Sequence, residues 1–202
     1  MTKIKLCGLS RPCDIDAANK QKPEYIGFVF TQKSQRYVTP QQAEKLKQML
    51  SPEIKAVGVF VNEDSKIIAA LLKKGIIDIV QLHGNEDETY ISQLHSLFGK
   101  PIIKAFRIVD SSDIEKAKKC TADYILLDSG AGTGTVFDWN LIKNIKRPYF
   151  LAGGLDADNV RSAIRILHPY AVDVSSGIET DGKKDSQKMT EFISAVRKEG
   201  QI

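Results

Sequence analysis

The sequence predicts a (β/α)8 barrel, and three observations lead to this fold. Eight short apolar runs alternate with segments of helical pattern, and strands that alternate with helices form parallel sheets. Several runs are continuously apolar, which is typical of strands buried on both faces. The chain has 202 residues, so eight units would have 202/8, about 25 residues each. This total matches the lower limit of about 200 residues for such a barrel.

The expected strands are rich in β-branched and aromatic residues, which favour a pleated, buried backbone. They cover residues 4–7, 25–30, 56–61, 77–82, 102–106, 124–127, 149–152 and 171–174. A doubly wound open sheet is the competing architecture, but it usually has fewer strands. No linker-like stretch divides the chain, so residues 1–202 are expected to form a single domain.

Start and stop signals define the expected helices. They cover residues 14–19, 40–50, 65–74, 86–98, 112–120, 140–145, 159–167 and 186–199. Thr39 is a favourable N-cap and Pro40 suits the first helical position. Gly75 follows the third helix as a C-terminal glycine. Ser112 and Glu115 have the spacing of a capping box.

The composition excludes several classes of protein. The net charge is +4, from 29 basic and 25 acidic residues, and it is too mild and too evenly spread for a nucleic-acid or membrane-surface protein. No apolar run approaches the roughly 20 residues that span a bilayer, and the N-terminus lacks a secretory pattern. Three cysteines without a Cys-x-x-Cys pair argue against a disulfide framework or a zinc site. We therefore expect a cytoplasmic protein.

In a barrel of this kind, chemistry takes place at the C-terminal ends of the strands. Gly153 and Gly154 follow the seventh expected strand, and Ser176 and Gly177 follow the eighth. Backbone N–H groups after these two strands often bind phosphate, and glycine allows a close approach. Each pair on its own is equally compatible with a simple turn, but the two together favour a phosphate site.

Cys7 and Asp128 end the first and sixth expected strands and form a candidate acid–base pair. A thiolate can remove a proton, and a carboxylic acid can donate one. Their ordinary pKa values, about 8.5 and about 3.9, favour the opposite states. These roles therefore require positive charge or helix N-termini near the thiol and desolvation near the carboxyl. From the residues alone, a small buried Cys7 and a turn-forming Asp128 are the simpler interpretations.

Arg36 and His83 lie in loops that follow the second and fourth expected strands. An arginine can hold a carboxylate in a bidentate fork, although a solvated surface arginine is the simpler interpretation here. Histidine is the usual proton carrier near neutral pH. The alternative for His83 is an orienting or loop-packing role.

Two familiar motifs are nearly matched and are rejected. The segment from Gly177 to Lys184 resembles a Walker A loop, but Lys184 stands where Ser or Thr must bind magnesium. The segment from Gly130 to Thr135 resembles a dinucleotide fingerprint, but Thr135 replaces the third glycine. The histidines and cysteines also lack the spacing of a zinc site.

Taken together, the strand-end segments resemble phosphoribosylanthranilate isomerase, an enzyme family of tryptophan biosynthesis. The matching segments are KLCGL (5–9), SQRY (34–37), QLHG (81–84), LDS (127–129), GTGTVFDW (132–139), LAGGL (151–155) and VDVSSGIE (172–179). Single motifs are weak, whereas the ordered set spans the whole chain and is specific. One departure is conservative, since Leu9-Ser10-Arg11 stands where Ile-Thr-Arg is expected.

The resemblance implies an Amadori rearrangement of N-(5-phosphoribosyl)anthranilate to 1-(2-carboxyphenylamino)-1-deoxyribulose 5-phosphate without a cofactor. It implies that Asp128 is the general acid that opens the furanose ring and that Cys7 is the general base that removes the C2 proton. It also implies that Arg36 holds the anthranilate carboxylate. The remaining implied positions are Gly153, Gly154, Ser176 and Gly177 at the phosphate, and His83 and Asp173 lining the site. Asp173 could hydrogen-bond a ribose hydroxyl if it points inward.

The resemblance implies a small phosphosugar substrate and no nucleic acid, membrane or obligate protein partner. Other phosphosugar barrels are the first alternative, above all the histidine-pathway aldose–ketose isomerase. That enzyme would have an Asp in place of Cys7 and a substrate with two phosphates. A pentose-phosphate epimerase would need metal-binding His and Asp residues on several strands. The second alternative, a non-catalytic phosphate-binding barrel, is disfavoured by the intact pair of Cys7 and Asp128.

Overall fold

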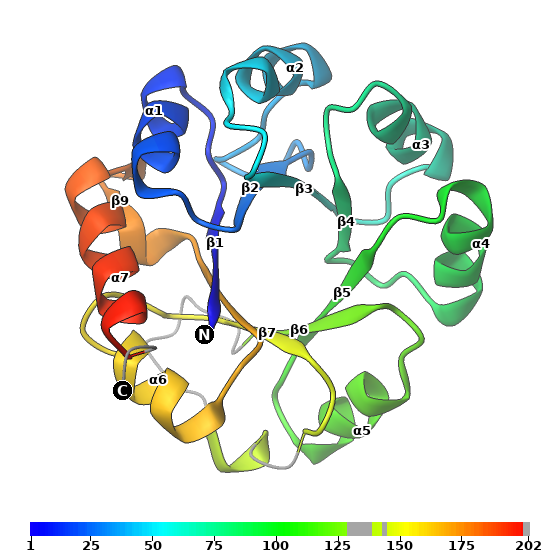
Figure 1. Ribbon diagram of the computed structural model, residues 1–202. Coiled ribbons are helices and arrows are strands. Elements are labelled where there is room, and N and C mark those ends of the chain that lie inside the picture. The colour runs from blue at the N-terminus through cyan, green and yellow to red at the C-terminus, as the bar shows by residue number, and fades with distance from the viewer. Residues whose placement is uncertain (129–138, 143–144, 200–202) are drawn as a thin grey trace.

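The computed structural model describes residues 1–128, 139–142 and 145–199, and these form a closed barrel of eight parallel strands (Figure 1). The strands are β1 (Lys3–Cys7), β2 (Tyr25–Val29), β3 (Lys55–Phe60), β4 (Ile79–Leu82), β5 (Ile102–Arg107), β6 (Tyr124–Asp128), β7 (Tyr149–Ala152) and β8 (Ala171–Val174). Their order around the barrel follows the sequence, and β1 closes it by pairing with both β2 and β8. The predicted (β/α)8 barrel is confirmed.

The helices form an outer ring around the strands (Figure 1). They are α1 (Pro12–Gln21), α2 (Pro40–Met49), α3 (Ser65–Lys73), α4 (Glu88–Phe98), α5 (Ser111–Lys119), α6 (Val160–Leu167) and α7 (Ser186–Glu199). The helices follow one another around the ring in chain order. The last helix, α7, therefore packs between α6 and α1, so that the last helix of the chain lies beside the first.

The two faces of the sheet pack into separate cores, because successive side chains of a strand point in opposite directions. One core lies between strands and helices and includes Leu6 and Phe28. The other lies inside the barrel and includes Val57 and Phe150. This double burial explains the continuously apolar strands of the sequence.

An aromatic cluster closes the barrel interior at the N-terminal ends of the strands. Tyr124 stacks on Tyr170 with ring centroids 5.0 Å apart, and Phe150 packs edge-on against both rings. Lys3 Nζ donates to Tyr170 Oη at 2.7 Å. Tyr25 Oη lies 3.1 Å from Tyr170 Oη. The barrel is therefore filled at this end and open to ligands at the other.

The helix starts expected at residues 40, 65 and 186 agree with the structure, but the capping box expected at Ser112 and Glu115 is wrong. The side chain of Thr39 accepts a hydrogen bond from the backbone of α2, as predicted. The N-cap of α5 is Asp110, whose carboxylate accepts from Ser112 N at 2.7 Å. The carboxylate of Asp113 accepts in return from the Asp110 backbone. A pair of carboxylates complements the positive end of the helix better than a hydroxyl does.

Two other segments differ from expectation. Among the described residues of the expected helix 140–145, only a 3₁₀ turn, η1 (Trp139–Leu141), is formed. An unpredicted hairpin follows β8 and η2 (Ser176–Ile178), and its strands are β9 (Glu179–Thr180) and β10 (Lys183–Lys184). Strands of two residues are too short to show any periodicity in the sequence.

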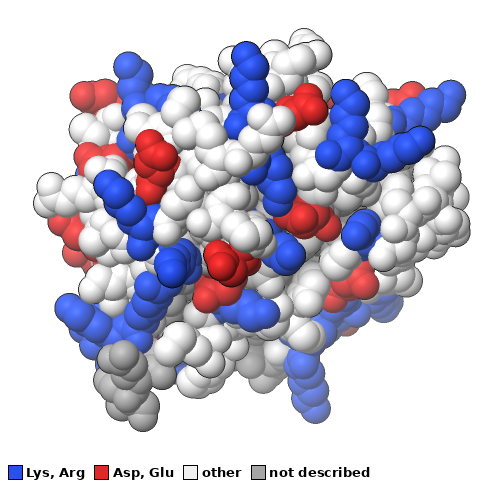
Figure 2. Space-filling view, turned by 45° about the horizontal axis from the view of Figure 1, so that its top comes forward, with Lys and Arg blue, Asp and Glu red and all other residues white. Residues whose placement is uncertain are grey.

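On the face that Figure 2 shows, Lys and Arg side chains are interspersed with Asp and Glu. Within the described residues, no helix is long and apolar enough to cross a membrane.

Candidate functional site

The C-terminal ends of the strands surround a cavity of about 340 Å³ at the mouth of the barrel. Eight of the nine predicted site residues line it, namely Cys7, Arg36, His83, Asp128, Gly153, Gly154, Asp173 and Ser176. Gly177 does not line this cavity and lies beside it on η2. The structure thus brings together residues that come from six different strand ends.

Cys7 is the last residue of β1 and is 9% exposed. Its partner in β2 is Gly27, where a Cβ would lie only 2.8 Å from Cys7 Sγ. Burial raises the pKa of the Cys7 thiol, while the nearby Lys5 and Lys184 ammonium groups act in the opposite direction. The positive charge that the role of base requires is therefore present near the thiol. The effect of burial is larger, so the pKa of Cys7 lies above its ordinary value.

Asp128 ends β6, and its side chain faces His83 across the mouth. His83 Nε2 lies 3.5 Å from Asp128 Oδ2. On its other side, His83 Nδ1 lies 3.0 Å from the side-chain nitrogen of Gln81. When the amide of Gln81 donates to Nδ1, the ring carries its proton on Nε2, which faces the Asp128 carboxylate.

Asp173 points into the barrel from β8 and forms an ion pair with Lys5 from β1. Lys5 Nζ lies 2.9 Å and 3.0 Å from the two carboxylate oxygens, and the Lys5 side chain is fully buried. Burial opposes the charge on Lys5, but attraction to Asp173 and Cys7 prevails and raises its pKa. Asp173 therefore has a protein partner beneath the cavity, which the sequence did not indicate.

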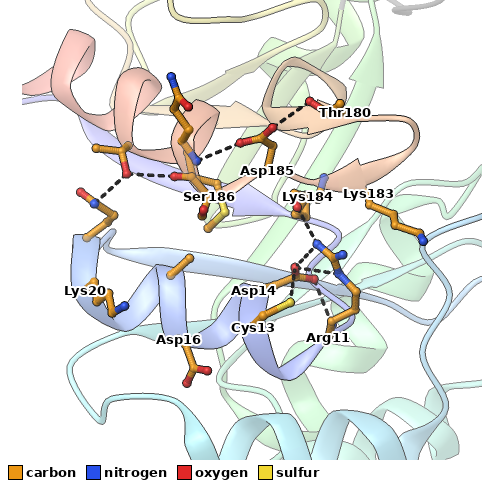
Figure 3. Close-up of a pocket in the computed structure, with 15 residues that line it drawn as sticks. Arg11, Cys13, Asp14, Asp16, Lys20, Thr180, Lys183, Lys184, Asp185 and Ser186 are labelled. Carbon is orange, nitrogen blue, oxygen red and sulfur yellow. Dashed lines mark hydrogen bonds and ion pairs between the residues drawn. The ribbon is translucent and has the colours of Figure 1, made fainter.

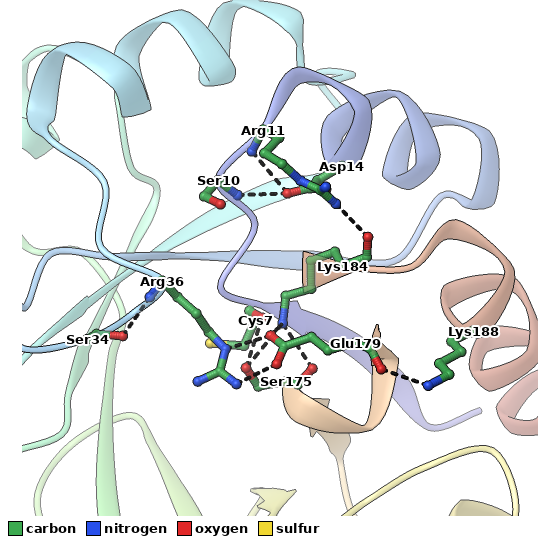
Figure 4. Close-up of polar contacts among 10 residues, drawn as sticks. All are labelled: Cys7, Ser10, Arg11, Asp14, Ser34, Arg36, Ser175, Glu179, Lys184 and Lys188. Carbon is green, nitrogen blue, oxygen red and sulfur yellow. Dashed lines mark hydrogen bonds and ion pairs between the residues drawn. The ribbon is translucent and has the colours of Figure 1, made fainter. Parts of the chain in front are cut away.

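Arg36 is not a solvated surface side chain but is held by a carboxylate from the hairpin (Figure 4). Its Nε and Nη2 each lie 2.6 Å from one oxygen of Glu179. Lys184 Nζ binds the same carboxylate at 2.6 Å and also donates to Ser175 O at 2.9 Å. Despite desolvation, these two cations lower the pKa of Glu179. Sequence reasoning missed Glu179 and Lys184 as neighbours of the site.

The same network explains why the Walker-like segment is not a nucleotide loop. Gly177 lies in η2, Gly182 forms the hairpin turn with φ +72°, and Lys184 lies on β10. The Lys184 ammonium is used within the protein to join Glu179 and Ser175. The rejected dinucleotide-like segment and motif residues 129–138 lie outside the described part of the chain.

The two expected phosphate loops are in close contact. A Cβ at Gly177 would lie 2.0 Å from Leu155 O, which belongs to the loop after β7. Gly154 adopts φ +64°, a conformation that favours glycine. The loops after β7 and β8 therefore form one continuous backbone surface beside the mouth, as a shared phosphate site requires.

Gly177→Ala is expected to destabilise the protein by about 1–3 kcal/mol, the usual cost of overpacking. The reason is that the backbone carbonyl of Leu155 cannot move without displacing its loop. Urea denaturation measures the free energy of unfolding. Ser176→Ala, at the neighbouring position, is the matched control and should unfold at nearly the wild-type urea concentration. Equal stability of wild type and Gly177→Ala would contradict the tight contact.

A second hollow lies outside the barrel, between α1 on one side and the hairpin and the start of α7 on the other (Figure 3). In it, Arg11 forms an ion pair with Asp14 at 2.7 Å and donates to Lys184 O. Asp14 also accepts from the backbone of Ser10. Arg11 thus fastens the hairpin to the start of α1, and Asp14 holds Arg11 in place.

The described residues contain no group of three or more His, Cys, Asp or Glu side chains that could hold a metal ion. A closed parallel barrel with acid–base side chains and adjoining glycine loops at its C-terminal mouth defines the protein as a (β/α)8-barrel enzyme.

Sequence comparison assigns the family within this class. The model of the N-(5'-phosphoribosyl)anthranilate (PRA) isomerase family matches residues 4–195. The chain belongs to this family. It is 47% identical to N-(5'-phosphoribosyl)anthranilate isomerase of Clostridium acetobutylicum over 207 aligned residues, which cover 98% of this chain and 99% of that protein.

Solved structures agree with this assignment. Phosphoribosylanthranilate isomerase of Thermotoga maritima superposes with a TM-score of 0.91 and is 36% identical, covering 98% of this chain and 100% of that one. A crystal structure of a phosphoribosylanthranilate isomerase in complex with reduced 1-(o-carboxyphenylamino)-1-deoxyribulose 5-phosphate superposes with a TM-score of 0.88, at 36% identity and the same coverage.

Proposed function

We propose that this chain converts N-(5-phosphoribosyl)anthranilate to 1-(2-carboxyphenylamino)-1-deoxyribulose 5-phosphate in tryptophan biosynthesis. The observation that carries this proposal is the single cavity in which Cys7, Asp128 and Arg36 meet beside the glycine loops. The relative that binds a reduced form of the product supports a ligand of this chemistry.

The substrate has a phosphate at one end and a carboxylate at the other, and both ends find complementary groups. The loops of Gly154 and Ser176 offer backbone N–H groups to the phosphate. Arg36 offers its guanidinium to the carboxylate, and Glu179 fixes it through Nε and Nη2, which leaves Nη1 for a ligand. Holding both ends positions the sugar between the acid and the base.

In the proposed reaction, Asp128 donates a proton to the furanose ring oxygen, and the ring opens to a Schiff base. The Cys7 thiolate then removes the proton from C2 to give an enolamine, which becomes the ketose when C1 gains a proton and the C2 hydroxyl loses one. His83, held by Gln81, faces the Asp128 carboxylate and orients it.

A fluorescence assay with the purified chain tests the proposal directly. Phosphoribosylanthranilate fluorescence should fall with time, and a preparation of Asp128→Asn made in the same way should show a far slower decrease. The two-phosphate substrate of the histidine pathway serves as the comparison, and we expect no turnover of it. A folded protein that leaves phosphoribosylanthranilate unchanged would disprove the proposed function.

Arg36→Ala is expected to raise KM by about 10- to 150-fold, because a hydrogen bond to a charged group contributes about 1.5–3 kcal/mol. The kcat should change little, since Arg36 binds the end of the substrate that does not react. Glu179 retains Lys184 as a partner, so the variant should still fold. Arg36→Lys is the matched variant, which keeps the charge but loses the fork, and its KM should be intermediate. A lower kcat at unchanged KM would contradict the carboxylate role.

We also propose that the protein acts in the cytoplasm without an obligate protein partner. All three cysteines, Cys7, Cys13 and Cys120, are free thiols, and the proposed base requires a reduced thiol.

A further inference from the structure

We propose that Lys5 is a positioning residue for the reaction and that its ammonium group, anchored by Asp173, stabilises the thiolate of Cys7 from inside the barrel. This inference rests on the proposed function, since it assigns a purpose to the base of that reaction. Lys5 lies one layer below Cys7, because residues two apart on a strand point to the same side.

The geometry at Gly27 places the Lys5 ammonium and the Cys7 thiol close to the same point of β2. A Cβ at Gly27 would lie 2.8 Å from Cys7 Sγ and 3.3 Å from Lys5 Nζ. Both groups therefore lie near the β2 backbone at Gly27, which carries no side chain. Any larger residue at position 27 would separate them or displace one of them.

The ion pair of Lys5 and Asp173 is difficult to explain as a stabilising element. Both side chains are removed from water, and replacing such a pair with apolar residues is often neutral or stabilising. The surrounding barrel interior is largely apolar, with Val57 and Phe150 in one cluster and Val59 beside Cys7 in another. A charged pair at this level is expected where it serves the thiol above it.

The charged groups around Cys7 come from four elements, and their signs determine the expected effect. Lys5 on β1, Lys184 on β10 and Arg36 after β2 favour the thiolate, whereas Asp173 on β8 opposes it. Burial raises the pKa of Cys7, and the attraction of Lys5 counters this more than Asp173 reinforces it. Removal of Lys5, alone or together with Asp173, must therefore raise the pKa of the thiol further.

Thiol alkylation tests this inference without any turnover. The reporter is a Cys13→Ser, Cys120→Ala background, in which Cys7 is the single cysteine and lines the open mouth. The rate of iodoacetamide modification is measured against pH by mass spectrometry, since only the thiolate reacts. Lys5→Met should shift the profile to higher pH by at least about one unit, so that the rate at pH 8 falls by about tenfold.

Two further variants control for misfolding and for effects that do not depend on proximity to Cys7. Lys5→Met leaves Asp173 buried without its partner and can fail to fold. The double variant Lys5→Met, Asp173→Asn removes both charges, and its profile should also shift to higher pH, by less. Lys3→Met is the matched control at the opposite end of β1, where Lys3 donates to Tyr170, and it should leave the profile unchanged.

An unchanged alkylation profile in folded Lys5→Met or in the double variant would overturn the inference. The same holds for an equal shift in Lys3→Met, because the effect would then not depend on proximity to Cys7. If phosphoribosylanthranilate is not consumed but the shift is observed, the proposed function fails while the role of Lys5 toward Cys7 stands. In an active enzyme, the pH profile of kcat/KM should shift in the same direction as alkylation.

Discussion

Replacing Cys7 with serine is expected to lower kcat by about 10²- to 10⁴-fold, the usual contribution of a general base. A hydroxyl is a much weaker acid than a thiol, so serine supplies almost no anion to remove the C2 proton. The side chain is nearly isosteric and sits in a well-packed site at 9% exposure, so the fold should be retained. Steady-state kinetics with phosphoribosylanthranilate measure the loss, and circular dichroism checks folding.

Cys13→Ser is the matched control for this experiment. Cys13 lies on α1 outside the barrel mouth and is exposed, so the same chemical change there should leave kcat unaltered. A folded Cys7→Ser enzyme with a kcat close to wild type would show that another group is the base.

Replacing Asp128 with asparagine is expected to reduce kcat by a similar factor, about 10²- to 10⁴-fold. The amide keeps the shape of the carboxyl group but cannot protonate the ring oxygen, so ring opening becomes slow. In this variant, His83 faces a neutral amide in place of the Asp128 carboxylate. The KM should change less than kcat, because the proposed role of Asp128 is at the reacting atoms and the proposed contacts to the two ends of the substrate are elsewhere.

The chain contains a second His–Asp pair that serves as a control. His95 Nε2 lies 3.0 Å from Asp123 Oδ2, near the opposite end of β6 from Asp128. Asp123→Asn makes the same atomic change there and should leave kcat at the wild-type value, whatever it costs in stability. If both variants lose activity equally, Asp128 has no special role in the chemistry.

Much of the fold was predictable because strand and helix patterns are local. The continuous apolar runs identified all eight strands to within a few residues, and Thr39 marked the start of α2 as expected. The errors arose where several polar residues compete. Asp110, Ser112 and Asp113 are all acceptable caps, and the two carboxylates prevailed. The strands β9 and β10 are too short to show an alternating pattern of apolar and polar residues in the sequence.

The predicted site residues converge on one cavity, except that Gly177 lies at its edge. Strand ends of a barrel must meet, so their positions followed from the fold. The side chains that pair with them could not be predicted from the fold, because each partner is distant in the sequence. Arg36 and Glu179 are separated by 143 positions, and Lys5 and Asp173 by 168. Charged residues inside apolar strands, Lys5 in β1 and Asp173 in β8, are the local signals that could have indicated the buried ion pair.

The closure of the barrel between β1 and β8 has a consequence for how the protein is made. The ribosome produces β1 first and β8 last among the barrel strands, so β1 keeps an open edge for most of synthesis. Until β8 docks, Lys5 lacks its carboxylate and the mouth is incomplete. The newborn chain therefore closes the barrel, completes the mouth and forms its buried ion pair in one late step.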